Sequence, residues 1–154
     1  MRNNMDKNNI KITKMAIEDL NQIKDFLKED FDDFWNASIL KSELENSNSQ
    51  YYVAKENNEI IGFAGFLVLI DSTEITNIVV KKNKRGNGIS KLLLEQLINE
   101  TSKLKKEKIS LEVNENNTIA INLYNKYNFI KEGLRKKYYN GTDNALIMTK
   151  YLDF

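Results

Sequence analysis

The stretch "VVKKNKRGNGISKLL", Val79 to Leu93, joins a β-branched run to a leucine-rich helical pattern through a basic turn with two glycines. The first backbone N–H groups of a helix have no internal partner and face outward at the positive end of the helix dipole. Glycines allow an anion to come close to such a backbone. The stretch therefore predicts a strand, a turn and a helix whose start binds an anion, although a plain turn explains these residues equally well.

Two known phosphate motifs do not fit this turn. A Walker loop needs G-x-x-x-x-G-K-[ST], which Gly86 to Lys91 does not supply. The dinucleotide fingerprint G-x-G-x-x-G fails because Lys91 stands where its third glycine belongs. The pattern that remains is Arg85-x-x-Gly88-x-Ser90.

The composition restricts the possible functions. A length of 154 residues predicts one domain spanning residues 1–154, and 23 basic against 22 acidic residues argue against a general nucleic-acid binder. No apolar run approaches the roughly 20 residues that span a membrane, and no signal-peptide apolar region is present, so we expect a cytoplasmic protein. The absence of Cys and His excludes disulfides, thiol nucleophiles, histidine triads and the usual zinc sites. Acid–base chemistry is left to Asp, Glu, Tyr and Lys.

Hydrophobic periodicity predicts a mixed α/β domain of order β-α-α-β-β-β-α-β-α-β-β. We expect a mostly antiparallel sheet with helices on both faces and one parallel crossover through the helix after the glycine turn. The predicted strands are 10–15, a hairpin over 50–71 with its turn at 56–58, 72–80, 108–113, and a second hairpin of 129–139 and 144–152. The predicted helices are 17–27, 38–44 with Ser38 as N-cap, 88–104 and 117–127.

Two segments in the right order carry a family resemblance. "ITNIVVKKNKRGNGISKLLLEQLI" (75–98) resembles the acetyl-CoA loop of the GCN5-related N-acetyltransferases (GNATs), whose pattern is Arg/Gln-x-x-Gly-x-Gly/Ala after a strand. "LEVNENNTIAINLYNKYNFIKEGLRKKYY" (111–139) resembles the ribosomal-protein alanine N-acetyltransferase branch, with LEVR-x-SN, LY-x-K-x-GF and G-x-R-x-x-YY. The match covers nearly the whole chain and is densest from Ile75 to Tyr139. This sequence departs from the pattern at Ser90, Asn114, Asn116, Asn128 and in "FWN" around Trp35.

The resemblance implies that the loop binds acetyl-CoA, with the pyrophosphate on its backbone amides and with no metal. It also implies that a backbone N–H between Ile78 and Val80 stabilises the oxyanion. Asn117 matches an asparagine that contacts the cofactor, and its position before a helix equally suits an N-cap. The cofactor-binding residues expected are Ile78, Val79, Val80, Arg85, Gly86, Asn87, Gly88, Ile89, Ser90, Lys91 and Asn117.

Glu112 and Tyr124 are the candidate catalytic residues. Strand alternation places Glu112 on the face opposite to the apolar residues of "KISLEV", and a partly desolvated carboxylate there would suit a general base. The structural alternative is a surface glutamate on an edge strand. Tyr124 belongs to an apolar helical stripe and could simply be a core aromatic. The resemblance implies that Glu112 is the base and Tyr124 the acid that protonates the CoA thiolate. Glu74 is a reserve candidate for the base because it lies on another strand that we expect to be central, although a surface or supporting role suits it better.

The resemblance further implies that the acceptor is the N-terminal alanine of a small-subunit ribosomal protein. A terminal amine has a pKa near ~8, so a modest base suffices. Trp35, Tyr138 and Tyr139 are the expected acceptor-binding residues, beside the acidic run of Glu29, Asp30, Asp32 and Asp33. Two other functions remain open, namely acetylation of a lysine side chain, polyamine or small amine, and a non-catalytic acyl-CoA-binding module. We expect a monomer or weak dimer with no direct nucleic-acid or membrane partner.

Overall fold

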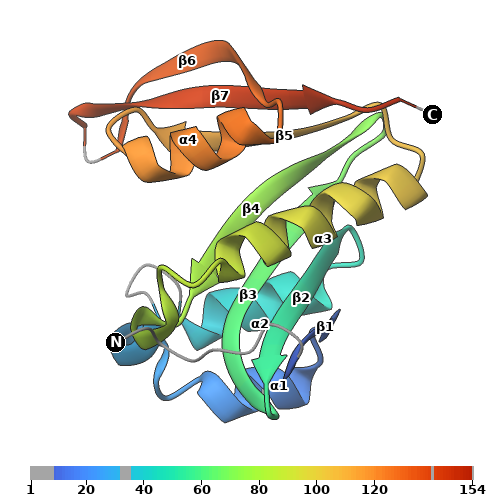
Figure 1. Cartoon of the computed structure of the whole chain (residues 1–154), viewed down its shortest axis with the longest axis vertical. Helices are drawn as coiled ribbons and strands as arrows, with labels where there is room; N and C mark the ends of the chain where they lie inside the picture. Colours follow the sequence, from blue (N-terminus) through green and yellow to red (C-terminus); the bar gives the residue numbers. More distant parts are fainter. Residues whose placement is uncertain (1–8, 32–35, 140, 154) are drawn as a thin grey trace. The chain divides into compact units, whose positions relative to one another are not determined.

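The computed structural model describes residues 9–31, 36–139 and 141–153. They form two compact units, which are described separately (Figure 1). The first comprises the described residues of Met1–Leu67 with Thr76–Leu97, and the second those of Val68–Ile75 with Ile98–Phe154. Strand β4 (Ser72–Val80) and helix α3 (Ile89–Lys103) each run from one unit into the other.

The first unit has the strand order β1-β2-β3-β4, from β1 (Ile10–Lys14), β2 (Ser49–Glu56), β3 (Glu59–Val68) and the C-terminal half of β4. Both β1–β2 and β2–β3 are antiparallel. The β2–β3 turn lies at Asn57 and Asn58, whose φ angles are 51° and 71°. Asparagine tolerates this left-handed region, which tight hairpin turns require, so the predicted hairpin turn is confirmed.

The N-terminal helices differ in detail from their predictions. The helix predicted over 17–27 ends earlier: α1 spans Ile17–Ile23, and a π-helix, η2, follows at Leu27–Phe31. Between them Phe26 N–H donates to Ile23 O, a tighter turn, and the change of pitch leaves both Leu27 and Phe31 buried.

Helix α2 (Ala37–Glu45) shows a second difference, at its start. Asn36 is the N-cap, because its Oδ1 accepts from Ile39 N–H at 2.9 Å, so the prediction of Ser38 as N-cap is wrong. Ser38 is the second residue of α2, so it lies within the helix and not at the N-cap position.

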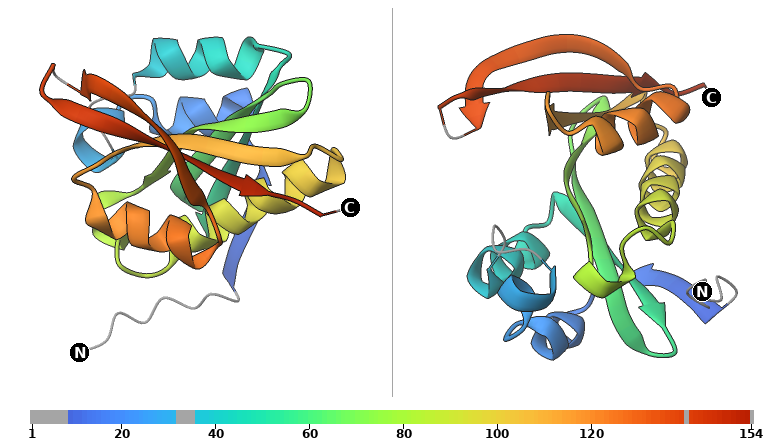
Figure 2. Two further views of the ribbon diagram at one scale, coloured as in Figure 1. Left: turned by 90° about the horizontal axis from the view of Figure 1, so that it is seen from above. Right: turned by 60° about the vertical axis from the view of Figure 1, so that its left-hand side comes forward.

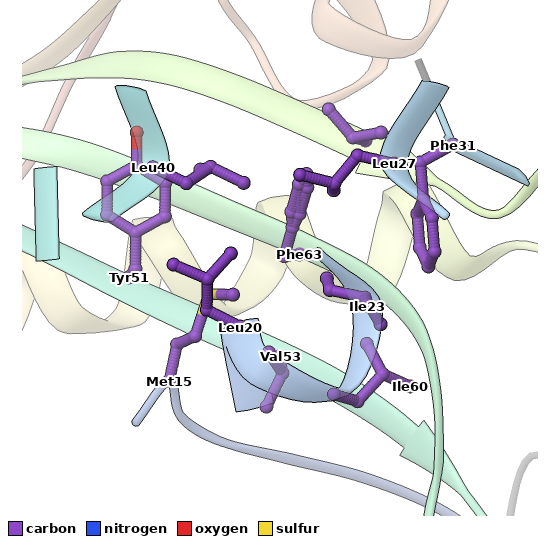
Figure 3. Close-up of a cluster of buried hydrophobic side chains, with 11 residues drawn as sticks. Met15, Leu20, Ile23, Leu27, Phe31, Leu40, Tyr51, Val53, Ile60 and Phe63 are labelled. Carbon is purple, nitrogen blue, oxygen red and sulfur yellow. The ribbon is translucent and has the colours of Figure 1, made fainter. Parts of the chain in front are cut away.

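The first unit is covered by helices on both faces of its strands (Figure 2). On one face, apolar residues of α1, η2 and α2 pack against β2, β3 and β4, and Figure 3 shows this core. On the other face, a β-carbon at Gly62 would come within 3.2 Å of Ile89 and Leu93 side-chain atoms, so α3 packs there without room to spare. The buried cluster of the first face consists of Met15, Leu20, Ile23, Leu27, Phe31, Leu40, Tyr51, Val53, Ile60, Phe63 and Val79.

The second unit has the strand order β4-β5-β7-β6, from the start of β4, β5 (Lys108–Asn114), β7 (Asp143–Tyr151) and β6 (Ile130–Tyr139). The β4–β5 pair is parallel, as predicted for the crossover through α3, and β5–β7 and β7–β6 are antiparallel. Helix α4 (Thr118–Lys126) completes the unit. The predicted mixed α/β class with a mostly antiparallel sheet is confirmed, while the single domain over 1–154 stays a prediction.

Candidate functional site

The glycine loop of the first unit carries the backbone geometry of a helix start. Strand β4 ends at Val80, a short 3₁₀ turn, η3, spans Lys82–Lys84, and α3 begins at Ile89. Gly86 and Gly88 have φ angles of 81° and 82°, a region that favours glycine. A β-carbon at Gly86 would meet nothing within 4 Å, so the loop is open there.

The first helical bond of α3 runs from Leu92 N–H to Gly88 O at 3.2 Å. The N–H groups of Ile89, Ser90 and Lys91 precede this bond and are the free donors of the helix start. Because the positive end of the helix dipole lies at the same place, this backbone fits an anion such as a pyrophosphate.

Side chains brace the loop from within. The Arg85 guanidinium donates from Nε to Val80 O at 3.0 Å and from a terminal nitrogen to Phe31 O at 2.6 Å, which fastens the loop to β4 and η2. The Asn87 amide donates to Lys84 O at 3.0 Å. Arg85 and Asn87 were predicted to contact the cofactor, and the structure gives each of them a role in holding the loop backbone.

The lysines of the loop are engaged with the first unit as well. Lys84 Nζ lies 2.8 Å from Glu56, and the hydrogen bond to that carboxylate raises the pKa of the Lys84 ammonium. Lys81 Nζ lies 3.0 Å from Glu59, and Lys82 Nζ donates to Lys28 O at 3.3 Å. The predicted binding of an anion by this loop therefore stays with the backbone N–H groups of the helix start, because Lys81, Lys82 and Lys84 contact other groups of the first unit.

Glu112 occupies the β5 face that the alternation predicted. Ile109, Leu111 and Val113 are buried, while Glu112 is half-buried on the other face. Strand β5 pairs with β4 only at Lys108–Ser110 but with β7 along its whole length, so it is not an edge strand. Glu112 lies beyond the part of β5 that pairs with β4 and stands opposite Ile147 of β7, so the role of Glu112 as base stays a prediction.

Arg135 of β6 is an ion-pair partner of Glu112 that sequence reasoning missed. One of its terminal nitrogens lies 2.9 Å from Glu112 Oε1. The two residues are separated by β7, where Ala145 stands opposite both Arg135 and Asn114. Arg135 stands opposite Ala145 and Glu112 opposite Ile147, two residues further along the same face of β7. The available signal was "GLR" in β6, but the strand order that makes the contact possible is not visible in the sequence.

Helix α4 holds Tyr124 and is fixed at both ends. Asn117 is its N-cap, with Oδ1 accepting from Ala120 N–H at 3.2 Å, so the predicted capping role is confirmed and the contact with the cofactor stays a prediction. At the other end, Lys150 Nζ donates to Tyr127 O at 2.7 Å. Alternation places Lys150 on the sheet face opposite to Glu112, so α4 covers the face that Glu112 does not share.

The C-terminus of α4 forms a Schellman motif. Asn128 N–H donates to Asn125 O and Phe129 N–H to Tyr124 O, both at 3.1 Å, with Asn128 at a φ of 67°. The rings of Phe129 and Tyr124 lie 5.7 Å apart, which is the apolar contact that accompanies this motif. The replacement of the usual glycine by Asn128 is thus compatible with the backbone, as predicted.

The candidate residues fall into the two units as follows. Ile78–Val80 and the loop residues 85–91 belong to the first unit, and Glu112, Asn117 and Tyr124 to the second. Glu74, the reserve base, stands opposite Ser110 in the second unit. Tyr138 and Tyr139 lie in β6, but their side chains are outside the described part, as are Trp35, Asp32 and Asp33 altogether. Glu29 and Asp30 lie in η2.

Among the described residues, no three His, Cys, Asp or Glu side chains gather where they could hold a metal ion. Over the same residues, no helix has the length and apolar character needed to cross a membrane.

Comparison with known proteins identifies the family. Residues 20–129 match the family model described as "Acetyltransferase (GNAT) family". The [ribosomal protein bS18]-alanine N-acetyltransferase of Haemophilus influenzae is 36% identical over 124 residues, which cover 77% of this chain and 82% of that protein.

Solved structures agree with this assignment. The ribosomal-protein-S18-alanine N-acetyltransferase from Escherichia coli superposes with a TM-score of 0.85 at 26% identity, over 94% of this chain and 95% of that one. A GNAT family acetyltransferase from Elizabethkingia anophelis, solved with acetyl-CoA bound, has a TM-score of 0.74 at 25% identity, over 95% of this chain and 100% of that one. The predicted family and enzyme class are confirmed, and the chain belongs to the acetyltransferase (GNAT) family.

Proposed function

We propose that this chain transfers the acetyl group of acetyl-CoA directly to the N-terminal alanine of a small-subunit ribosomal protein, with both reactants bound together. The proposed acceptor is supported by the 36% identity, over 77% of this chain, with an enzyme named for acetylating ribosomal protein bS18. The donor rests on the family and on a structural relative solved with acetyl-CoA bound.

The loop of the first unit fits the donor. Bound acetyl-CoA supplies an acetyl group activated as a thioester, and its pyrophosphate is the anion that a helix start favours. The N–H groups of Ile89, Ser90 and Lys91 bind the pyrophosphate, and the open space at Gly86 lets it approach the backbone. One N–H between Ile78 and Val80 holds the carbonyl oxygen as negative charge develops on it.

Glu112 and Tyr124 carry the proton transfers. Glu112 accepts one proton from the acceptor ammonium, directly or through one water, and the neutral amine nitrogen that results forms a bond to the acetyl carbon. Tyr124 donates its hydroxyl proton to the sulfur as the carbon–sulfur bond breaks, which leaves coenzyme A as its thiol. The second proton that the nitrogen loses returns through solvent to the Tyr124 oxygen and restores the hydroxyl. This chemistry needs no His, Cys or metal, in keeping with a chain that has neither His nor Cys.

The remaining features of the proposal concern the acceptor and the setting. Tyr138, Tyr139 and Trp35 bind the acceptor peptide, and Asn117 contacts the cofactor in addition to capping α4. The chain works as one domain, as a monomer or weak dimer in the cytoplasm, without binding nucleic acid or membrane.

Two substitutions test the roles of the catalytic pair. Glu112→Gln and Tyr124→Phe should each lower kcat by about 10² or more, because each removes a proton acceptor or donor from the transition state. The affinity for coenzyme A, measured by calorimetry, should stay within about twofold. Glu107→Gln and Tyr127→Phe change the same residue types in the same unit and serve as matched controls. Two fully active variants would refute the assignment.

A panel of acceptors tests the substrate. Mass spectrometry should detect acetylation of alanine-starting peptides and little of spermidine or of peptides whose only free amine is a lysine side chain. Activity confined to the small amines or to the lysine side chain would contradict an alanine N-terminus as the acceptor and would identify that amine as the acceptor instead. Coenzyme A binding without transfer to any amine would indicate a non-catalytic module instead.

A further inference from the structure

A buried polar network in the first unit has one member with an unused acceptor. The Tyr51 hydroxyl lies 2.9 Å from Thr76 Oγ1 and 3.3 Å from Asn77 Nδ2, and Thr76 Oγ1 donates to Gly65 O at 3.1 Å. Tyr51 belongs to the apolar core of this unit (Figure 3), and Asn77 is only 8% exposed. Thr76 and Asn77 directly precede the β4 segment whose amides are proposed to hold the acetyl group.

The directions of these hydrogen bonds fix the orientation of Asn77. Thr76 has a single hydroxyl proton, which Gly65 O receives, so the Tyr51 hydroxyl must donate to Thr76. The Tyr51 oxygen then accepts from Asn77 Nδ2. A flipped amide would turn Oδ1 toward an oxygen that has no proton left to give. Oδ1 therefore points away from the network.

Asn77 Oδ1 is the one buried side-chain polar atom without a hydrogen-bond partner among the described residues. An unsatisfied buried acceptor lowers stability, and such atoms are rare enough in native proteins to require an explanation. A leucine of similar size would fill the same space without that cost. The acceptor is explained if a donor arrives with a bound reactant.

The charge near the network favours a positive donor. Glu43 of α2, held by a 2.8 Å hydrogen bond from Ser49 Oγ, places its negative charge close enough to act on Tyr51. Burial first, and this charge after it, raise the pKa of Tyr51 to about 12, so the hydroxyl stays neutral at physiological pH. A charged donor such as an ammonium forms a stronger hydrogen bond to a buried carbonyl oxygen than a neutral N–H does.

We propose that Asn77 Oδ1 accepts a hydrogen bond from the ammonium group of the acceptor and positions that amine beside β4 before transfer. This assigns a substrate-binding role to a residue outside the set of Glu112, Tyr124 and the loop. The inference rests on the proposed function, in that it requires an amine acceptor, but not on the acceptor being an alanine N-terminus.

Two variants test this role, one that removes the acceptor oxygen of Asn77 and one that keeps an acceptor oxygen at the same position. Asn77→Leu removes the acceptor atom at nearly constant volume, so KM for an alanine-starting peptide should rise about tenfold or more, while KM for acetyl-CoA stays within about twofold. Its melting temperature should change little, because the loss of the long 3.3 Å hydrogen bond from Asn77 Nδ2 to Tyr51 is offset by removal of the unsatisfied oxygen. Asn77→Asp keeps an oxygen acceptor and should keep KM for the peptide within about threefold, although burial of its carboxylate lowers the melting temperature.

The outcomes separate this inference from the proposed function. An unchanged KM for the peptide in Asn77→Leu overturns the inference about Asn77. If only the KM for acetyl-CoA rises, the inference is also overturned, and the hydrogen bond to Asn77 Oδ1 comes from an amide N–H of the cofactor. If the wild-type protein acetylates spermidine or a lysine side chain in place of the peptide, the proposed acceptor fails, and the same comparison is made with that amine. A wild-type protein that acetylates no amine overturns both.

Discussion

Replacing Asn128 by glycine and by alanine measures how the end of helix α4 is held. Asn128 has a φ of 67° and donates to Asn125 O in the Schellman motif. The left-handed region costs a residue with a β-carbon roughly 1–2 kcal/mol of conformational free energy and costs glycine nothing, and the cost for asparagine lies between these values. Asn128→Gly should therefore be more stable than wild type and Asn128→Ala less stable, with about 1–2 kcal/mol between the two variants.

The measurement is urea unfolding followed by circular dichroism, supported by thermal melts. For a chain of this length, the difference corresponds to about 2–8 °C in melting temperature between the two variants. Asn125→Ala is the control, because Asn125 is exposed inside the same helix, where alanine should raise stability by about 0.5 kcal/mol. If Asn128→Ala were as stable as Asn128→Gly, the backbone conformation would not be the reason for the residue at this position.

Three further changes test other parts of the structure. Gly65→Ala should lower the free energy of unfolding by about 1–3 kcal/mol, because its β-carbon would lie 2.5 Å from ring atoms of Tyr51, and a urea titration in which it unfolds like wild type would contradict this contact. Tyr51→Phe should flatten the loss of stability at high pH. Burial raises the pKa of Tyr51 from 10.0 to about 12, so between these values the unfolded chain releases the proton first and wild-type stability falls with rising pH, by up to about 1.4 kcal/mol per pH unit. Equal slopes for wild type and variant in urea melts from pH 9 to 11 would exclude this assignment. The buried hydroxyls of Thr73 and Thr101 lie 2.7 Å apart, so the valine substitutions at these positions should each cost about 1–2 kcal/mol, and the double variant less than their sum, in a double-mutant cycle.

Elements with a clear local signal were predictable from the sequence. The β4–loop–α3 segment, the Asn57–Asn58 hairpin turn and the alternation in β5 each depend on neighbours a few residues apart, and each is confirmed. Errors appeared where two local signals compete. Asn36 and Ser38 can both cap a helix, and only the position of the first turn decides between them. The end of α1 depends on how Leu27 and Phe31 reach the core, which periodicity does not reveal.

The residues of the candidate site were less predictable than the fold. The pairing of Arg135 with Glu112 depends on β7 lying between their strands, a strand order that no local pattern encodes. The orphan oxygen of Asn77 depends on the directions of hydrogen bonds from Tyr51 and Thr76. Both are products of residues far apart in the chain, whereas Glu112 and Tyr124 could be named because each stands in a recognisable motif.

The internal pairing of the loop lysines bears on how the protein discriminates among anions. A run of free cations would attract any polyanion, since affinity for nucleic acid grows with each phosphate that is neutralised. Here Lys81 and Lys84 form ion pairs with Glu59 and Glu56, and Arg85 donates hydrogen bonds to backbone carbonyl oxygens. In the proposed function the loop binds a pyrophosphate through backbone N–H groups, so its binding depends less on unpaired lysines than nucleic-acid binding does. Weak attraction of this loop to RNA would be an advantage for an enzyme whose proposed acceptor belongs to a particle rich in RNA.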